Sequence, residues 1–115
     1  MNKSSAKDDA EFVRHIVEAI NLIEQYVKGV DEEAFIKNNE KHDAAIRELI
    51  VIGEAAKGIS DNFKAKNSSV EWRKLAGVRD IMVHQYFKLN LDAVWSIIDK
   101  DLPGLKNKLT RLAAH

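Results

Sequence analysis

The sequence contains no cysteine and little proline or glycine. The absence of cysteine excludes both disulfide bonds and metal sites built from thiolates. A single proline and five glycines in 115 residues leave few tight turns, which favours long helices over a turn-rich β-sheet fold. This length suits one domain, so residues 1–115 are predicted to form a single domain with one packed core.

Long apolar runs and an excess of one charge are missing as well. No stretch approaches the roughly eighteen consecutive apolar residues that a membrane-spanning helix needs. The first residues, Met1–Asp9, are polar and charged, unlike a secretory signal, so a soluble cytoplasmic protein without membrane contact is expected. The 18 basic and 18 acidic side chains give a formal net charge of zero. That balance argues against a protein that coats nucleic acid through its overall charge, and any RNA contact must come from a local basic patch.

Apolar residues recur at steps of three and four, which is the spacing of helices that bury one face. A first helix is expected up to Gly29, which would provide its C-terminal cap, and Asp31 is expected to cap a short helix over residues 32–37. The longest apolar run follows and predicts one continuous helix with a buried stripe: Ala45, Leu49, Ile52, Ala56, Ile59 and Phe63.

The rest of the chain also reads as helical. Gly77 is expected to let the chain turn sharply into a helix containing residues 79–86. Asn90 would cap a helix over residues 91–100, and Pro103 would lie in the first turn of the last helix. The sequence therefore predicts an all-α protein, an up-and-down bundle of four to five helices with a short extra helix. Small side chains along the longest run would let another helix approach closely: Ala44, Ala45, Gly53, Ala55 and Ala56.

Residues 79–86, Arg-Asp-Ile-Met-Val-His-Gln-Tyr, bring a cation, a carboxylate, an imidazole and a phenol together. At about 100° per residue, Arg79 and His84 would point about 140° apart on one straight helix. Tyr86 would fall within about 20° of Arg79 if the helix reached that far. Two copies of the segment across a two-fold axis would bring an arginine and a histidine to one phosphate. The spacing therefore favours a homodimer with a shared site.

The pattern Arg-x4-His-x-Tyr resembles the signature of the HEPN nucleases, and most closely that of their HepT-like branch of toxins. A second block resembles the same branch over residues 43–49 and 52–57, Asp-Ala-Ala-Ile-Arg-Glu-Leu and Ile-Gly-Glu-Ala-Ala-Lys. A third block holds Trp72, Arg73, Gly77 and Arg79, and Val-Trp-Ser-Ile-Ile and Asp-Leu-Pro follow at the expected distances. The resemblance covers the chain from about Phe12 to Leu109, so a HEPN-type bundle is expected.

The resemblance implies an endoribonuclease that uses no metal and no cofactor and leaves a 2′,3′-cyclic phosphate on its RNA substrate. Arg79 would hold the phosphate, since a guanidinium matches phosphate oxygens with parallel donors. His84 would act as general base or acid, since imidazole transfers protons near neutral pH. Asp80 would orient Arg79 or His84.

The resemblance also gives Tyr86 a regulatory role. In HepT-like toxins the tyrosine of His-x-Tyr accepts AMP from a partner antitoxin, a minimal nucleotidyltransferase. AMP on Tyr86 would bring a negative phosphate and a bulky base into a site for RNA phosphate. Tyr86 must then be exposed, and its neighbour Phe87 is expected to lie in the core instead.

Other polar residues have an ordinary and a functional interpretation. Arg47 and Glu54, seven residues apart, would share a helix face and line the cleft beside Arg79; the ordinary interpretation of these two residues, and of Asp43, is a surface ion pair for each. His15 and His42 lack metal-ligand spacing, so no metal site is expected.

Trp72 and Trp95 are expected in the core rather than stacked on bases. A basic rim or ordinary solvated side chains would account for six residues: Lys57, Lys64, Lys66, Arg73, Lys74 and Lys88.

Two other functions remain open. One is a non-catalytic HEPN module that binds nucleotide or serves as the partner of a nucleotidyltransferase, and the other is a purely structural helical dimer. A degenerate module would be expected to have lost Arg79 or His84. Both are present, which favours the ribonuclease toxin.

Overall fold

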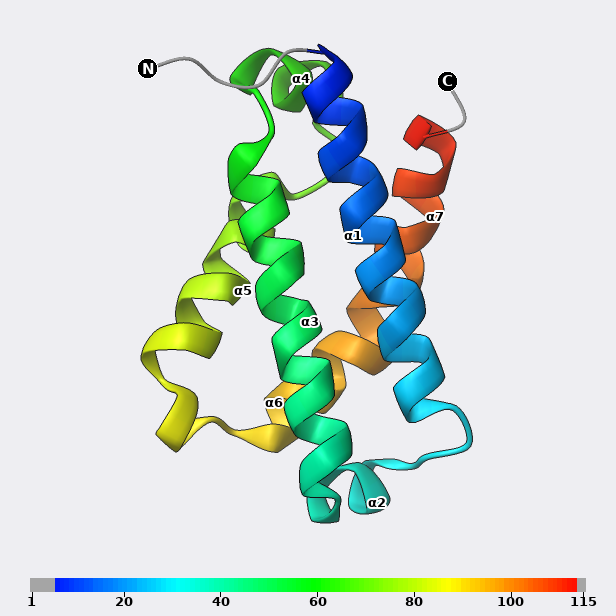
Figure 1. Ribbon diagram of the computed structural model, residues 1–115, viewed down its shortest axis with the longest axis vertical. Helices are drawn as coiled ribbons and strands as arrows, with labels where there is room; N and C mark the ends of the chain where they lie inside the picture. Colours follow the sequence, from blue (N-terminus) through cyan, green and yellow to red (C-terminus); the bar gives the residue numbers. More distant parts are fainter. Residues whose placement is uncertain (1–5, 114–115) are drawn as a thin grey trace.

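Four long helices run along the length of the molecule (Figure 1). The computed structural model describes residues 6–113, which span 41 × 28 × 19 Å. The long helices are α1 (Ala6–Val27), α3 (Asn39–Gly58), α5 (Trp72–His84) and α7 (Leu102–Ala113). Residues 6–113 contain no strand, so the prediction of an all-α bundle is confirmed. No helix in this range combines the length and the apolar composition needed to cross a membrane.

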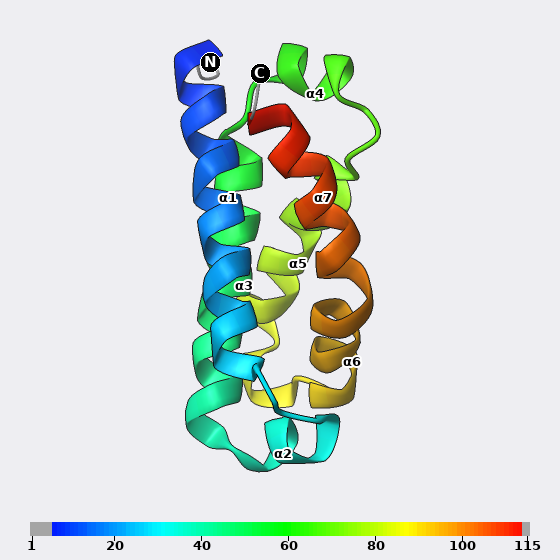
Figure 2. The same ribbon diagram turned by 90° about the vertical axis from the view of Figure 1, so that its right-hand side faces the viewer.

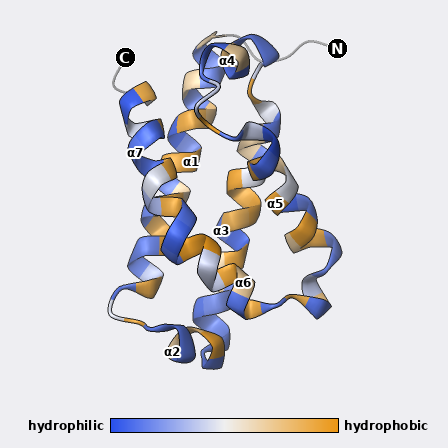
Figure 3. Ribbon diagram, turned by 180° about the vertical axis from the view of Figure 1, so that it is seen from behind, coloured by the Kyte–Doolittle hydropathy of each residue, from blue (hydrophilic) through white to orange (hydrophobic). Residues whose placement is uncertain are grey.

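Short helices close the two ends of the bundle. α2 (Glu32–Lys37) lies at one end and α4 (Asp61–Lys66) at the other (Figures 1 and 2). Helix α3 packs between α1 and α5, and α7 packs against α1. From behind, α3 is seen between α5 and α7 (Figure 3). The signature segment of α5 is therefore supported mainly by one helix, α3.

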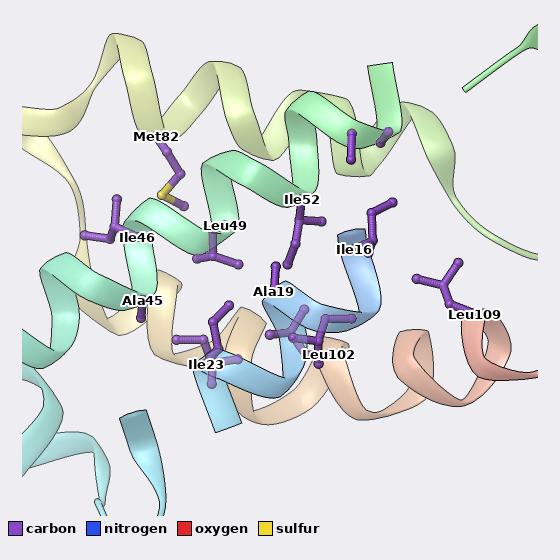
Figure 4. Close-up of a cluster of buried hydrophobic side chains, with 14 of the residues drawn as sticks. Ile16, Ala19, Ile23, Ala45, Ile46, Leu49, Ile52, Met82, Leu102 and Leu109 are labelled. Carbon is purple, nitrogen blue, oxygen red and sulfur yellow. The ribbon is translucent and has the colours of Figure 1, made fainter. Parts of the chain in front are cut away.

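The core consists of the apolar stripes that the sequence predicts. Ile16, Ala19, Ile20 and Ile23 of α1 are at most 2% exposed. They face the α3 stripe, with Met82 entering from α5 and Leu102 and Leu109 from α7 (Figure 4). Full burial of one such aliphatic side chain stabilises the fold by roughly 1.5–3 kcal/mol.

The predicted helix caps are confirmed. The side chain of Asp31 accepts a hydrogen bond from the amide of Ala34, and α2 has the predicted bounds. Gly29 follows α1 with a φ of +72°, a backbone conformation that is unfavourable for residues with a Cβ atom and typical of a glycine that caps the C-terminus of a helix. Asn90 accepts from the amides of Asp92 and Ala93 and so starts α6 (Leu91–Ser96).

The prediction of one continuous helix through Phe63 is wrong. Helix α3 ends at Gly58, Ile59 is extended, and Phe63 belongs to α4. Ser60 causes the break, because its hydroxyl accepts from the amide of Phe63 and caps α4. The buried carboxylate of Asp9 in α1 accepts from both the amide and the hydroxyl of Ser60, which fixes the turn. Periodicity alone does not reveal such a cap.

Two other boundaries also differ from the prediction. A π-helical turn, η2 (Ile97–Asp101), joins α6 to α7 without a break. Pro103 lies in the first turn of α7, as predicted. Because proline has no backbone N–H, it cannot donate to the carbonyl of Asp99, and the missing α-helical bond is consistent with a change of hydrogen-bonding pattern just before it. Gly77 lies inside α5 and makes no sharp turn.

Candidate active site

Arg79 lies directly over Gly53, where α5 crosses α3. A Cβ atom added to Gly53 would lie 2.1 Å from the Cβ of Arg79, and 3.0 Å from both its Cα and its backbone nitrogen. Only a glycine therefore allows α5 to come this close. The predicted close approach of a helix to the small residues of α3 occurs here, within one chain. It therefore does not support a dimer.

Gly53→Ala is expected to destabilise the protein by about 1–3 kcal/mol, because the new methyl group must push α5 and Arg79 away from α3. Gly77→Ala is the matched control, since an added Cβ in the same helix meets no atom within 4 Å. The control is expected to be neutral, or to gain about 0.5–1 kcal/mol of helix propensity. Denaturant unfolding measures both. Equal stability of the two variants would contradict the close contact.

Two carboxylates fix the guanidinium of Arg79. Its Nε donates to Glu54 Oε1 at 2.7 Å, and its Nη1 donates to Asp80 Oδ1 at 3.1 Å. Lys57 Nζ donates to the same Asp80 oxygen at 2.6 Å. The side chain of Arg79 is 27% exposed, so it is held in place and still reaches solvent. We call these four residues, Glu54, Lys57, Arg79 and Asp80, the Arg79 cluster.

The Arg79 cluster leaves part of the guanidinium available. Of its five N–H groups, two are used by Glu54 and Asp80, and within residues 6–113 no partner is found for the second N–H of Nη1 or for either N–H of Nη2. That free edge has the geometry for two parallel bonds to a phosphate. The hydrogen bond to Glu54 first, and that to Asp80 second, raise the pKa of Arg79. Lys57 first, and Arg79 second, lower the pKa of the Asp80 carboxyl, which keeps it charged.

His84 is the last residue of α5 and is exposed. Within residues 6–113, no hydrogen bond or ion pair joins its imidazole to another side chain. Asp80 bonds Arg79 and Lys57, and within residues 6–113 no hydrogen bond or ion pair joins it to His84. Within the described residues no hydrogen bond or ion pair links Arg79 to His84, and their five-residue separation on one helix turns the two side chains about 140° apart.

Tyr86 lies just beyond α5, in the 3₁₀ turn η1 (Tyr86–Lys88). Because the helix ends at His84, the alignment with Arg79 expected for a longer helix does not occur. The hydroxyl of Tyr86 donates instead to Asp43 Oδ1 of α3 at 3.3 Å, and Tyr86 is 45% exposed. The charge of Asp43 first, and this hydrogen bond second, raise the pKa of the phenol. Asp43 is therefore a further residue of the candidate site, although the sequence predicted only a surface ion pair for it.

Arg47 occupies the same face of α3 as the residues that meet α5. Asp43 contacts Tyr86 and Glu54 contacts Arg79, and Arg47 lies between them along this face at helical spacing. The two contacts also show that α3 and α5 run antiparallel, so Arg47 lies near the level of His84. Arg47 is exposed and has no ion pair within the described range. Arg47 is therefore a second exposed cation on the α3 face that meets α5.

The expectation that Phe87 belongs to the core is wrong. Phe87 is 97% exposed, and its ring packs edge-to-face with the Tyr86 ring, 5.4 Å between centroids. The reason is that α5 ends at His84 and the chain leaves the surface of α3 before reaching Phe87. Three neighbours are also exposed, which gives an apolar segment of Ile81, Val83, Tyr86 and Phe87.

The tryptophans are core residues, as expected. Trp72 is 6% exposed and donates its indole N–H to the carbonyl of Asn67, and Trp95 packs on Phe35 with centroids 5.2 Å apart.

His42 is buried, with Nδ1 3.2 Å from the carbonyl oxygen of Phe35, whereas the side chain of His15 is half exposed. Within residues 6–113, no group of three or more side chains could hold a metal ion.

Comparison with known proteins identifies the family of the chain. A profile of the family described as "Ribonuclease HepT-like" matches residues 16–112. "Probable ribonuclease HepT" of Thermococcus cleftensis is 36% identical over 110 residues, which cover 96% of this chain and 97% of that protein. A protein of Caldanaerobacter subterraneus subsp. tengcongensis, named as a candidate RNase, is 33% identical over 106 residues, which cover 92% of this chain and 95% of that protein.

One relative is much longer than this chain. A Methanocaldococcus jannaschii protein, named as gamma-glutamylcyclotransferase and candidate RNase, is 36% identical over 106 residues, which cover 92% of this chain. The chain spans about half of that relative, 48% of its length. No solved structure matches the chain at a significant level.

Proposed function

Because the chain belongs to the ribonuclease HepT-like family, we propose that it is a metal-independent endoribonuclease whose active site is shared between two copies. Its 115 residues form a single HEPN domain that acts in the cytoplasm as the toxin of a toxin–antitoxin pair. The observation that carries the proposal is the Arg79 guanidinium, which is fixed by two carboxylates and keeps a free edge for phosphate.

The proposed reaction uses one histidine from each copy. His84 of one copy removes the proton from a ribose 2′-hydroxyl, whose oxygen then attacks the adjacent phosphorus. The bond from phosphorus to the 5′-oxygen of the next nucleotide breaks, and that oxygen takes a proton from the second copy's His84 as imidazolium. The products are a 2′,3′-cyclic phosphate and a 5′-hydroxyl. Arg79 stabilises the charge that builds up on the phosphorus oxygens.

A second copy supplies what one chain lacks. Arg79 leans on α3, and His84 stands at the end of α5 without a partner, so a two-fold axis near this end would pair Arg79 of one copy with His84 of the other. The exposed apolar segment, Ile81, Val83, Tyr86 and Phe87, adjoins these residues and provides the surface to bury. Burying the Phe87 ring alone would stabilise the dimer by roughly 1.5–3 kcal/mol.

Phe87→Glu is therefore expected to convert the protein from dimer to monomer at micromolar concentration, because a charge would replace the proposed anchor of the interface. Leu22→Glu is the control, since Leu22 is 37% exposed and lies on α1, which does not carry the signature. Sedimentation equilibrium distinguishes the two masses. A monomeric wild type, or equal dissociation of both variants, would contradict the shared site.

Tyr86 is the proposed control point. A minimal nucleotidyltransferase antitoxin transfers AMP to its hydroxyl, which is exposed and lies at the same end of α5 as His84. The added phosphate and adenosine would occupy the RNA site and repel the substrate phosphates.

The cleavage products test the enzymatic proposal. Purified protein is incubated with mixed RNA, with and without EDTA, and fragment ends are analysed for 2′,3′-cyclic phosphate. Cleavage with cyclic ends in both samples is expected. Loss of cleavage in EDTA alone would refute the metal-independent mechanism. No cleavage, together with AMP transfer to Tyr86, would favour the alternative, a non-catalytic HEPN module that serves a nucleotidyltransferase.

A further inference from the structure

A basic hollow adjoins the Arg79 cluster. Its volume is about 970 Å³, and it lies where α4 and the start of α5 meet the end of α3. Three elements contribute its charged side chains, of which four are basic and two acidic: Lys57, Lys64, Arg73, Lys74, Asp61 and Glu71. Of the six basic residues considered from the sequence as a rim, Lys66 and Lys88 do not line this hollow.

Three of the four positive side chains of the hollow are available to a ligand, because Lys57 is bonded to Asp80. Lys64, Arg73 and Lys74 form no ion pair within residues 6–113. The hollow therefore has a local positive surplus in a chain whose formal net charge is zero. The Arg79 cluster has none, because Arg79 and Lys57 are balanced by Glu54 and Asp80. Binding of an RNA strand at Arg79 therefore needs a positively charged neighbouring surface that attracts its other phosphates.

Lys57 connects the hollow to the Arg79 cluster. Its ammonium lines the hollow and donates to Asp80 Oδ1 at 2.6 Å, and the same oxygen accepts from Arg79. Lys57 thus marks a direction in which a nucleic-acid strand held at Arg79 could continue into the hollow.

The lining indicates which part of the strand would be bound. Trp72 lines the hollow but is 6% exposed, and its indole N–H is already bonded to Asn67. The hollow thus offers little aromatic surface for stacking a base. Lysine and arginine without such a surface bind phosphates and give affinity without reading sequence. The volume lies at the upper end of the range of ligand clefts, roughly 300–1,000 Å³.

We propose that this hollow binds the phosphodiester backbone of the RNA strand that extends from the scissile phosphate at Arg79. The binding is electrostatic and independent of base identity. This inference rests on the proposed ribonuclease function and adds a substrate-binding site outside the reacting centre.

The test removes two charges that do not touch the Arg79 cluster. Lys64→Gln/Arg73→Gln neutralises the hollow and leaves Lys57 on Asp80. Lys28→Gln/Lys37→Gln is the matched control, since it makes the same change in net charge at the α2 end of the bundle, away from α4 (Figure 1). Each protein is assayed with a 20-nucleotide single strand and with a dinucleoside monophosphate, which fills only the reacting centre.

The hollow variant is expected to raise KM for the 20-nucleotide strand on the order of tenfold near 0.1 M salt, with kcat unchanged. The slope of log KM against log salt should fall by about 1.4, since each lost phosphate contact removes about 0.7. KM for the dinucleoside monophosphate should not change. The control double variant should match the wild type on both substrates.

The outcomes separate the inference from the proposed function. If the wild type cleaves and the hollow variant keeps the KM and salt slope of the control, the hollow does not bind RNA. If the wild type does not cleave, binding of the 20-nucleotide strand is measured by fluorescence anisotropy. Weaker binding by the hollow variant than by the control would then support the hollow while the catalytic proposal fails, and equal binding would refute both.

Discussion

Cleavage of RNA by the His84→Ala protein is expected to be about 10²–10⁴-fold slower than by the wild type, because the site loses its proposed acid–base group. The fold should not change, since His84 is exposed and no other described side chain bonds to it. His15→Ala is the control, because it removes an imidazole that is half exposed on α1. Single-turnover cleavage and thermal unfolding of the three proteins give the comparison.

Arg79→Lys should fail as well, although it keeps the charge. An ammonium cannot bond Glu54 and Asp80 and still offer two parallel donors to a phosphate. Arg14→Lys is the matched control, because Arg14 is an exposed residue of α1 that pairs with Glu11. Full activity of either His84→Ala or Arg79→Lys would refute the assignment of the site. Loss of activity in the His15 or Arg14 control would show that the assay reports folding and not chemistry.

The fold was largely predictable because most of its helices are amphipathic and carry local caps. The α1 stripe, the Asp31 cap and the Asn90 cap each depend on residues within one or two turns of one another. The break after Gly58 was not predictable in the same way. It depends on Asp9, whose carboxylate reaches Ser60 across 51 positions of sequence and stabilises a cap that interrupts an unbroken apolar pattern.

Part of the candidate site, like part of the fold, follows from local sequence, and part depends on contacts between distant residues. The octapeptide predicts Arg79, His84 and Tyr86 as site residues, and the seven-residue spacing of Arg47 and Glu54 places them on one face of α3. That Glu54 holds Arg79 depends on the register between two helices, which Gly53 sets through its missing side chain. The exposure of Phe87 depends on where α5 ends, and helix ends are the least certain part of any pattern.

Tyr86→Phe is expected to give a protein that its antitoxin cannot silence. The hydroxyl oxygen of Tyr86 is the proposed acceptor, because it would attack the α-phosphorus of ATP with loss of pyrophosphate. Phenylalanine lacks that oxygen and keeps the ring. The substitution removes one hydrogen bond, to Asp43, from a side chain that is 45% exposed, so stability should change little.

The second tyrosine of the chain provides the control. Tyr26 is half-buried in α1, outside the signature, so Tyr26→Phe should accept AMP as the wild type does. Each protein is mixed with the minimal nucleotidyltransferase and ATP. The molecular mass of the intact protein is then measured, and its activity on RNA is assayed. Wild type and Tyr26→Phe should gain one or more AMP units and lose activity. Tyr86→Phe should keep its mass and its cleavage.

Two other results would separate chemistry from binding. If Tyr86→Phe gains AMP and loses activity like the wild type, another side chain is the acceptor and Tyr86 is not the switch. If it keeps its mass but is still silenced, the antitoxin inhibits by occupying the site, and the exposed Tyr86–Phe87 surface would be the place where it docks. Only unchanged mass together with retained cleavage supports control through the Tyr86 hydroxyl, because then the loss of a single oxygen atom has uncoupled the enzyme from its inhibitor.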